Sequence, residues 1–305
     1  MWNMSFTPPV VVEAQVFARL PDALRIKQCS AWGDANKNGH PVDSFLEGPV
    51  FDTSGVLHVV DIPHGRILRI DAAGAWDVVA HTHGWPNGLA LHADGSLWVA
   101  DYRRGILRCD PDSGHVEGIL EHRNSESFKG INDLVFDRAG RLYFTDQGQT
   151  GLHDPTGRVY RYDPRDGRLD QLAGNVPSPN GIALDEQEKT LFVAVTRANQ
   201  VWRSPLMRDG TISKMGAFRT FFGTSGPDGL AVVPGGGLLV AHASLGGVFM
   251  LNAAGEVTHF LKSPIVASTV TNVAVTPDGK SVVMTESGSG AILMAELPEL
   301  PEIKV

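Results

Sequence analysis

The sequence predicts an all-β fold, a six-bladed β-propeller with four antiparallel strands in each blade. Three observations support this: a nine-residue motif occurs six times, its copies start 40 to 48 residues apart, and glycine-marked turns separate short apolar runs. A repeat of this length with four strands is typical of a propeller blade. The copies are EGPVFDTSG at 47–55, NGLALHADG at 87–95, NDLVFDRAG at 132–140, NGIALDEQE at 180–188, DGLAVVPGG at 228–236 and TNVAVTPDG at 271–279.

The second copy shows how one repeat predicts four strands. Its apolar runs at 88–91 and 96–100 flank an Asp-Gly turn at 92–95. A third run at 106–108 follows a polar turn, and a weaker fourth run lies at 116–120. Short apolar runs separated by such turns indicate β-hairpins, and a helical periodicity is not sustained.

The ring of blades must be closed by the ends of the chain. Residues 1–40 precede the first copy, and we expect them to complete the last blade with an outer strand, for which 10–12 and 15–18 are candidates. A β-sandwich or two barrels is the alternative architecture, but neither requires six equal copies. We therefore expect a single propeller domain over residues 1–305.

Composition argues against several functional classes. The net charge is −8, from 26 Lys and Arg against 34 Asp and Glu, and no basic run is present, so neither nucleic acid nor a membrane is an expected partner. The two cysteines, Cys29 and Cys109, cannot form a multi-thiolate zinc site. The sequence has neither signal-peptide features nor an apolar run of 18 residues, so we expect a cytoplasmic protein.

One polar position in each repeat predicts a functional site. In an up-and-down blade, the residue that precedes the innermost strand lies at the mouth of the central channel. Such residues often cap turns, but the mixture of carboxylates and amides here favours a functional ring. The six are Glu47, Asn87, Asn132, Asn180, Asp228 and Thr271.

The second strand of each blade ends at the same mouth and predicts a second, largely ionisable ring. We expect its members to line a pocket together with the first ring. The alternative is that their side chains bond backbone amides. They are Asp61, Asp101, Asp146, Val195, His242 and Glu286.

The first ring offers carboxylate and amide oxygens, the ligands that Ca²⁺, Mg²⁺ or Mn²⁺ prefer. A bound divalent ion can polarise a carbonyl or phosphoryl oxygen and acidify a water molecule. Asp228 would act beside the ion as a base or as a nucleophile. His242, from the second ring of the same blade, is a candidate proton relay.

The motifs EGPVFD at 47–52, PNGLALHADG at 86–95, INDLVFDRAG at 131–140, PNGIALD at 179–185 and PDGLAVVPGG at 227–236 resemble the gluconolactonase family. That family includes senescence marker protein and the firefly luciferin-regenerating enzyme. The resemblance covers about residues 40 to 297 and implies a six-bladed propeller with a divalent metal in its channel and lactone-hydrolysing activity.

The resemblance also implies roles for particular residues. Glu47, Asn180 and Asp228 correspond to metal ligands, and Asn132 to a ligand that binds directly or through water. Asp228 corresponds to the favoured catalytic residue, and Asp133 lies where some relatives hold a second, structural calcium. Gly130 replaces an arginine that is common in sugar-lactone members, which argues against a sugar-acid lactone as the substrate.

We therefore expect a metal-dependent lactonase that uses one divalent cation, Ca²⁺ first and Zn²⁺, Mn²⁺ or Mg²⁺ as alternatives. Hydrolysis of phosphotriesters or aryl esters at the same site is one alternative function. A calcium- or ligand-binding propeller without catalysis is another, since propellers host many functions. Candidate substrate-binding residues are Asn87, Tyr102, Arg103, Gln147 and His242.

Overall fold

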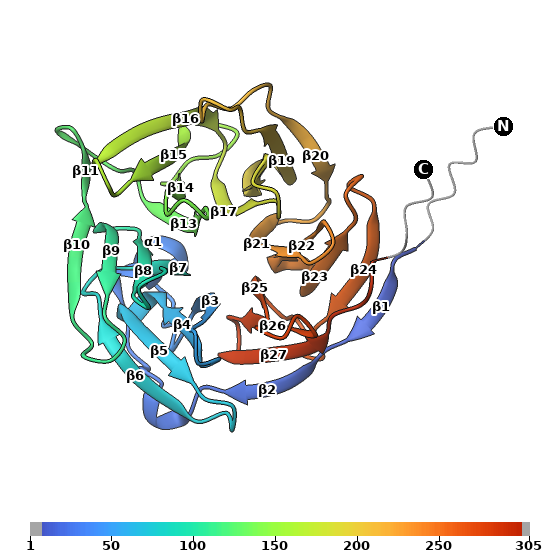
Figure 1. The fold of residues 1–305 in the computed structure, drawn as a ribbon. Helices are drawn as coiled ribbons and strands as arrows, with labels where there is room; N and C mark the ends of the chain where they lie inside the picture. The colour runs from blue at the N-terminus through green and yellow to red at the C-terminus, as the bar shows by residue number, and fades with distance from the viewer. Residues whose placement is uncertain (1–7, 301–305) are drawn as a thin grey trace.

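The computed structural model describes residues 8–300, in which five four-stranded sheets and one five-stranded sheet are arranged radially around a central axis (Figure 1). The predicted fold class, an all-β six-bladed propeller, is confirmed. In the blades that one continuous segment supplies, the four strands run in chain order from the axis outward.

The first three blades are built from consecutive segments. Blade one contains β3 (Leu46–Phe51), β4 (Leu57–Asp61), β5 (Arg66–Ile70) and β6 (Trp76–His81). Blade two contains β7 (Pro86–Leu91), β8 (Leu97–Asp101), β9 (Gly105–Cys109) and β10 (Val116–Leu120). Blade three contains β13 (Ile131–Phe136), β14 (Leu142–Asp146), β15 (Gly157–Asp163) and β16 (Arg168–Val176).

The remaining blades complete the ring. Blade four contains β17 (Pro179–Leu184), β18 (Thr190–Val195), β19 (Gln200–Pro205) and β20 (Gly216–Thr220). Blade five contains β21 (Pro227–Val233), β22 (Gly237–His242), β23 (Gly247–Leu251) and β24 (Val257–Lys262). Blade six contains β25 (Val270–Val275), β26 (Ser281–Glu286) and β27 (Ala291–Glu296).

The N-terminal segment supplies an outer strand to each of two blades. Strand β2 (Gln15–Arg19) pairs antiparallel with β27 and is the fourth strand of blade six. Strand β1 (Val10–Glu13) pairs parallel with β24 and adds a fifth strand to blade five. Both strands lie at the rim beside the last two blades (Figure 1), so the first strands of the chain pair with its last ones.

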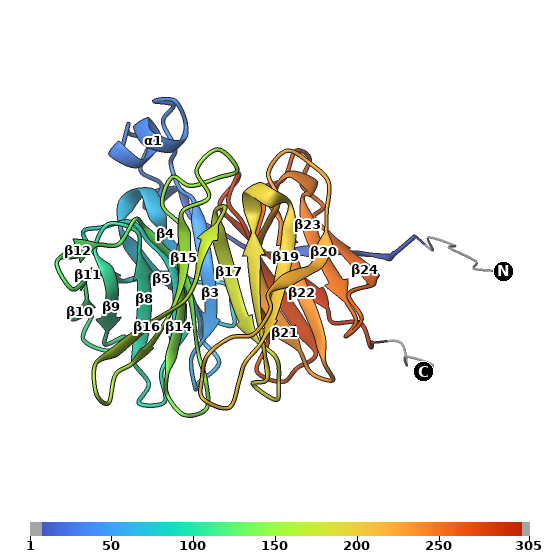
Figure 2. The same cartoon turned by 90° about the horizontal axis from the view of Figure 1, so that it is seen from above.

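The other elements are short connections. They are α1 (Ala31–Asn36), the hairpin β11 (His122–Arg123) and β12 (Glu126–Ser127), and the single-turn helices at Asp22–Leu24, Ile62–His64, Thr196–Ala198 and Ala243–Leu245. Helix α1 stands above one end of the propeller (Figure 2). Within residues 8–300, no helix has the length and apolar character needed to cross a membrane.

The core lies between blades rather than within one sheet. Val60 and Ile67 of blade one pack with Leu97 and Val99 of blade two, for example. Because each blade is covered on both faces, its second strand is apolar on both sides, and β4 and β8 are buried along their whole length. This explains why the repeats read as continuous apolar runs.

The ninth motif position requires a left-handed backbone conformation. The glycines there have positive φ, such as 84° at Gly55 and 88° at Gly95. Glu188 takes this position in the fourth copy and also has a positive φ of 54°, a conformation that costs a non-glycine residue free energy. The fourth copy therefore forms the same left-handed turn as the other copies, although it has no glycine at this position.

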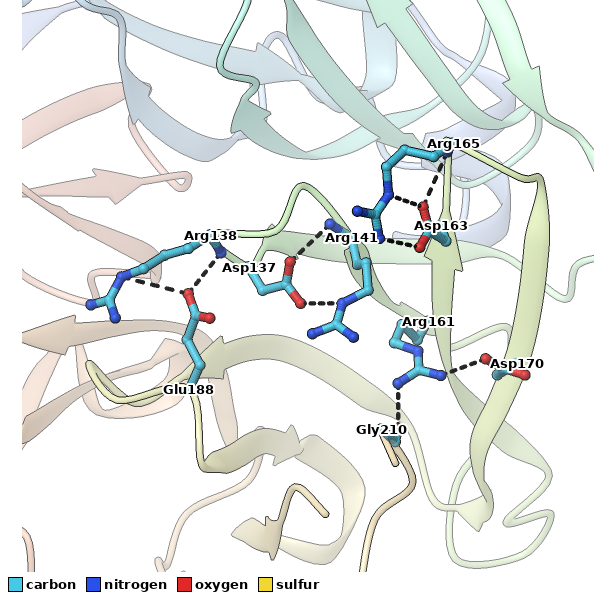
Figure 3. A network of polar contacts seen from close by, with 9 residues as sticks. All are labelled: Asp137, Arg138, Arg141, Arg161, Asp163, Arg165, Asp170, Glu188 and Gly210. Atoms are coloured by element: carbon cyan, nitrogen blue, oxygen red, sulfur yellow. Dashed lines mark hydrogen bonds and ion pairs between the residues drawn. The ribbon is translucent and has the colours of Figure 1, made fainter. Parts of the chain in front are cut away.

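Glu188 lies in the turn between β17 and β18 and belongs to the polar contacts drawn in Figure 3. Its carboxylate accepts a hydrogen bond of 2.7 Å from the backbone amide of Arg138. The guanidinium of Arg161, almost fully buried, donates to Asp170 and to the carbonyl oxygen of Gly210. The Arg138–Glu188 and Arg161–Gly210 bonds join blade three to blade four, whereas the Arg161–Asp170 pair lies within blade three.

Candidate metal centre

In all six inner strands the pairing with the second strand is irregular at the start of the motif. The pairing with the second strand shifts register there, for example between Glu47 and Val50 in β3 and between Pro227 and Leu230 in β21. The other four inner strands shift at the equivalent place. Because a bulge or similar shift in register re-aims the side chains beside it, the ring at the channel mouth depends on this irregularity.

The four predicted metal ligands lie on the inner strands of blades one, three, four and five. Glu47, Asn132 and Asn180 are buried, with at most 9% of their surface exposed, while Asp228 stays partly exposed. Asn180 lies close enough to the Asp228 carboxylate to lower the pKa of that group. The Asn132 amide donates a bond of 2.9 Å to Gln147 Oε1.

Glycine at the second motif position lets neighbouring inner strands approach closely. A Cβ on Gly181 would lie 2.3 Å from the Asp228 carbonyl oxygen. A Cβ on Gly229 would lie 2.0 Å from Asn272 Oδ1. No side chain fits at these two places, so glycine there brings the ligand-bearing strands together.

Two blades carry a side chain instead of glycine at this second position. Asn272 Nδ2 donates a hydrogen bond of 2.7 Å to Glu47 Oε2. Asp133 accepts bonds of 2.9 Å from the amide of Leu134 and 3.3 Å from the amide of Ile182, which belongs to the next blade. Asn272 was not among the predicted site residues, although its departure from glycine in the repeat is a signal that could have identified it.

Thr271 does not join the ring as a free polar group. The residue is only 1% exposed, and its hydroxyl forms hydrogen bonds with the side chains of Thr285 and Ser287 and with the carbonyl oxygen of Leu46. Blade six therefore contributes to the ring through Asn272, one residue further along the chain.

Three carboxylates meet near the axis at close enough range to affect each other. Burial raises the pKa of Glu47 well above its usual value, and the charge of Asp228 raises it further. Burial, followed by the charge of Asp133, raises the pKa of Asp228 to about 7. Burial also raises the pKa of Asp133 to about 7, so the three are costly to ionise together without a cation.

The donor set fits a hard divalent cation. Within residues 8–300, Glu47, Asp133 and Asp228 form no ion pair with a basic side chain. In the same part of the chain, no three His, Cys, Asp or Glu side chains are arranged to hold a metal by themselves. A metal at the mouth would thus need the amide oxygens of Asn132 and Asn180 beside the carboxylates, the mixture that calcium sites use.

The second ring bonds backbone amides, the alternative considered from the sequence. The residues are fully buried, and four carboxylates each accept a hydrogen bond from the connection that precedes the inner strand of their own blade. The pairs are Phe45 with Asp61, Trp85 with Asp101, Gly130 with Asp146 and Thr269 with Glu286, at 2.8 to 3.0 Å. These carboxylates fix the connections that lead into the first ring.

His242 is placed inside blade five. It is fully buried, its Nε2 lies 3.2 Å from Asn199 Oδ1, and its ring packs against Phe221 and Phe249. Burial lowers its pKa to about 4. These contacts do not bring His242 to Asp228, so the structure does not support it as a proton relay for that residue.

The other predicted substrate-binding residues surround the mouth. Gln147 bonds to Asn132 and donates a bond of 3.0 Å to Ser178 Oγ, and Asn87 is half-buried on β7. The Arg103 guanidinium lies 4.7 Å from the Trp85 ring. The Tyr102 ring fills the space beside Gly130, where a Cβ would lie 2.4 Å from it, so Tyr102 occupies the place of a side chain at position 130.

Comparisons with known proteins agree with this architecture. Residues 45–288 match the SMP-30/Gluconolactonase/LRE-like region family. The chain is 31% identical over 236 residues to the lactonase drp35 of Staphylococcus aureus. This alignment covers 73% of the present chain and 70% of the relative.

Solved structures show the same fold at lower sequence identity. The gluconolactonase XC5397 of Xanthomonas campestris superposes with a TM-score of 0.74 at 23% identity, covering 97% of this chain and 99% of that one. Regucalcin of Agrobacterium tumefaciens, a calcium-binding protein, superposes with a TM-score of 0.75 at 19% identity, covering 98% and 100%. The resemblance seen in the sequence motifs is confirmed, and the chain belongs to the SMP-30/gluconolactonase/LRE-like family.

Proposed function

We propose that this protein is a divalent-metal-dependent lactonase that hydrolyses a small lactone at the mouth of its central channel. One observation carries the proposal: Glu47, Asn132, Asn180 and Asp228 lie at equivalent positions near the start of four inner strands and offer oxygen ligands, and the carboxylates of Glu47 and Asp228 lack ion-pair partners within residues 8–300. Family membership supports the reaction class, since similar proteins include a lactonase and a gluconolactonase.

These four residues would hold the metal, and Ca²⁺ matches their mixture of carboxylate and amide oxygens best. When bound, a divalent ion polarises the ester carbonyl and lowers the pKa of a nearby water molecule. Glu47 is held in place for this role because Oε2 accepts hydrogen bonds from both Asn272 Nδ2 and the backbone amide of Gly48, each 2.7 Å long.

Asp228 is the base that accepts the proton of the attacking water. It remains partly exposed, so water can reach it, and Asn180 lies beside its carboxylate, close enough to lower its pKa. Asn132, held by Gln147, orients the lactone oxygen atoms. The protonated Asp228 then returns its proton to the alkoxide that leaves when the ring opens.

The test is a panel of lactones, phosphotriesters and aryl esters, assayed for acid release by the wild-type protein and by Asp228→Ala. We expect lactones to be the preferred class and the variant to lose about a thousandfold or more in kcat, with an unchanged circular dichroism spectrum. Preferred turnover of a phosphotriester or an aryl ester would replace the lactonase assignment. Metal binding without turnover of any substrate would identify a non-catalytic propeller.

A further inference from the structure

Helix α1 projects from one end of the propeller, to one side of the ring (Figure 2), and Lys37 follows it directly. Their position is fixed by packing. The Trp32 ring packs 4.9 Å from the Phe45 ring, two residues before Glu47. Ser30 Oγ accepts a hydrogen bond of 3.0 Å from the amide of Gly33 and so caps the start of the helix.

Two cavities open beside the mouth, and two consecutive residues at the end of α1 line them. Asn36 lines a cavity of about 560 Å³ together with Gln147, Ser178 and Arg197. Lys37 lines a cavity of about 430 Å³ together with Phe45, Thr269 and Ser287.

Each cavity adjoins a candidate metal ligand. In the first, Gln147 accepts the hydrogen bond from Asn132. In the second, Ser287 Oγ donates a bond of 2.6 Å to the carbonyl oxygen of Leu46, the residue before Glu47. Both cavities therefore border the immediate surroundings of a candidate ligand.

A cationic side chain without a partner faces each cavity. Within residues 8–300, neither Lys37 nor Arg197 forms an ion pair, whereas Arg66 and Arg158 near the same mouth are paired with Asp61 and Asp146. The Lys37 ammonium lies 4.8 Å from the Phe45 ring and 5.7 Å from the Trp32 ring, contacts that hold it in place.

The balance of charge favours an anionic ligand. Arg197 and Lys37 lie close enough to Asp228 for their positive charges to lower the pKa of its carboxylate. A divalent ion would offset two of the three carboxylates, those of Glu47, Asp133 and Asp228. The two free cations would then exceed the remaining negative charge by one, and the mouth would attract an anion although the whole chain carries a net charge of −8.

We infer that Lys37 and Arg197 select substrates that carry a carboxylate in addition to the lactone ring. This specificity rests on the lactonase function proposed above. The lactone carbonyl binds at the four candidate ligands, and the additional carboxylate lies in the cavity of Arg197 or in that of Lys37. No bond changes at either cation, so both act by positioning the substrate.

The test compares two lactones that differ in one charge, γ-carboxy-γ-butyrolactone and its carboxamide. We expect the wild-type protein to prefer the carboxylate in kcat/KM. Lys37→Met or Arg197→Met should lower the ratio of the two kcat/KM values about tenfold, through KM, in keeping with the loss of one charge contact. Arg208→Gln, at the far end of the same blade as Arg197, is the matched control and should leave the ratio unchanged.

A binding measurement separates this inference from the lactonase assignment. Tetrahydrofuroate and its amide lack the lactone carbonyl, and calorimetry on the calcium-loaded protein measures their binding without turnover. Tighter binding of tetrahydrofuroate that weakens in Lys37→Met or Arg197→Met supports the charge selection even if no lactone is hydrolysed. Equal binding of the two probes, or a preference that survives in the double variant, overturns it.

Discussion

The Nδ2 amide of Asn272 donates a hydrogen bond of 2.7 Å to Oε2 of Glu47, across the seam between the last blade and the first. This bond orients a candidate metal ligand from outside the ligand set. Removing such a supporting contact typically weakens metal affinity by about 10- to 100-fold. We expect this loss for Asn272→Ala, measured by calcium titration calorimetry, and an unchanged affinity for Gln187→Ala, an exposed residue at the opposite end. Unchanged affinity in Asn272→Ala would show that the bond does not support the site.

Close approach of the inner strands can be tested with two glycines. A Cβ on Gly229 would lie 2.0 Å from Asn272 Oδ1, whereas a Cβ on Gly216 meets nothing within 4 Å. We expect Gly229→Ala to lose about 1–3 kcal/mol of unfolding free energy and to weaken calcium binding, because Asn272 must move. Gly216→Ala should match or slightly exceed the wild type in denaturant unfolding. Equal stability of both variants would contradict the packing described here.

The two polar rings have separable functions. Asp101 is fully buried and accepts bonds of 3.0 Å from the amides of Trp85, Arg103 and Arg104. Asp101→Ala leaves these amides without their acceptor and should cost about 3 kcal/mol of unfolding free energy. Its calcium affinity should equal that of the wild type, since Asp101 is not a ligand. A large loss of affinity with unchanged stability would assign Asp101 to the site instead.

The buried carboxylates predict that stability depends on pH. The pKa values of Asp133 and Asp228 rise from 3.8 to about 7 on folding. The folded chain therefore binds more protons than the unfolded chain, and stability falls as the pH rises from about 4 to about 7. Chelator-treated protein should have a higher Tm at about pH 5 than at about pH 8, and Ca²⁺ should raise the Tm at the higher pH. A flat Tm in the chelated protein would contradict these shifts.

The repeat made both the fold and the first ring predictable. Six aligned copies placed Glu47, Asn132, Asn180 and Asp228 at equivalent positions, and topology then placed them at one channel mouth. The copies carry different polar residues at the first motif position, which is the position of the candidate ligands. An alignment of the repeats within this one chain was therefore enough to locate them.

Asn272 was missed because the alignment assigned the first position of blade six to Thr271. Both residues are polar, and only the three-dimensional contacts show that the Thr271 hydroxyl bonds to Leu46 and its neighbours while Asn272 bonds to Glu47. The irregular pairing of the inner strands also leaves no clear mark in residue type. The position of α1 depends on the packing of the Trp32 ring on the Phe45 ring. Neither residue belongs to the repeats, so the alignment could not predict this contact.

On the function proposed here, the four candidate ligands hold a divalent ion on which lactone hydrolysis depends. The most direct measurement follows acid release from a lactone while Ca²⁺ is added back to chelator-treated protein. We expect no turnover before Ca²⁺ is added, and then activity that rises in proportion to the binding of one ion at the mouth. Glu47→Gln should lose both the binding of that ion and the activity. Full lactone turnover by the chelated protein would contradict the account.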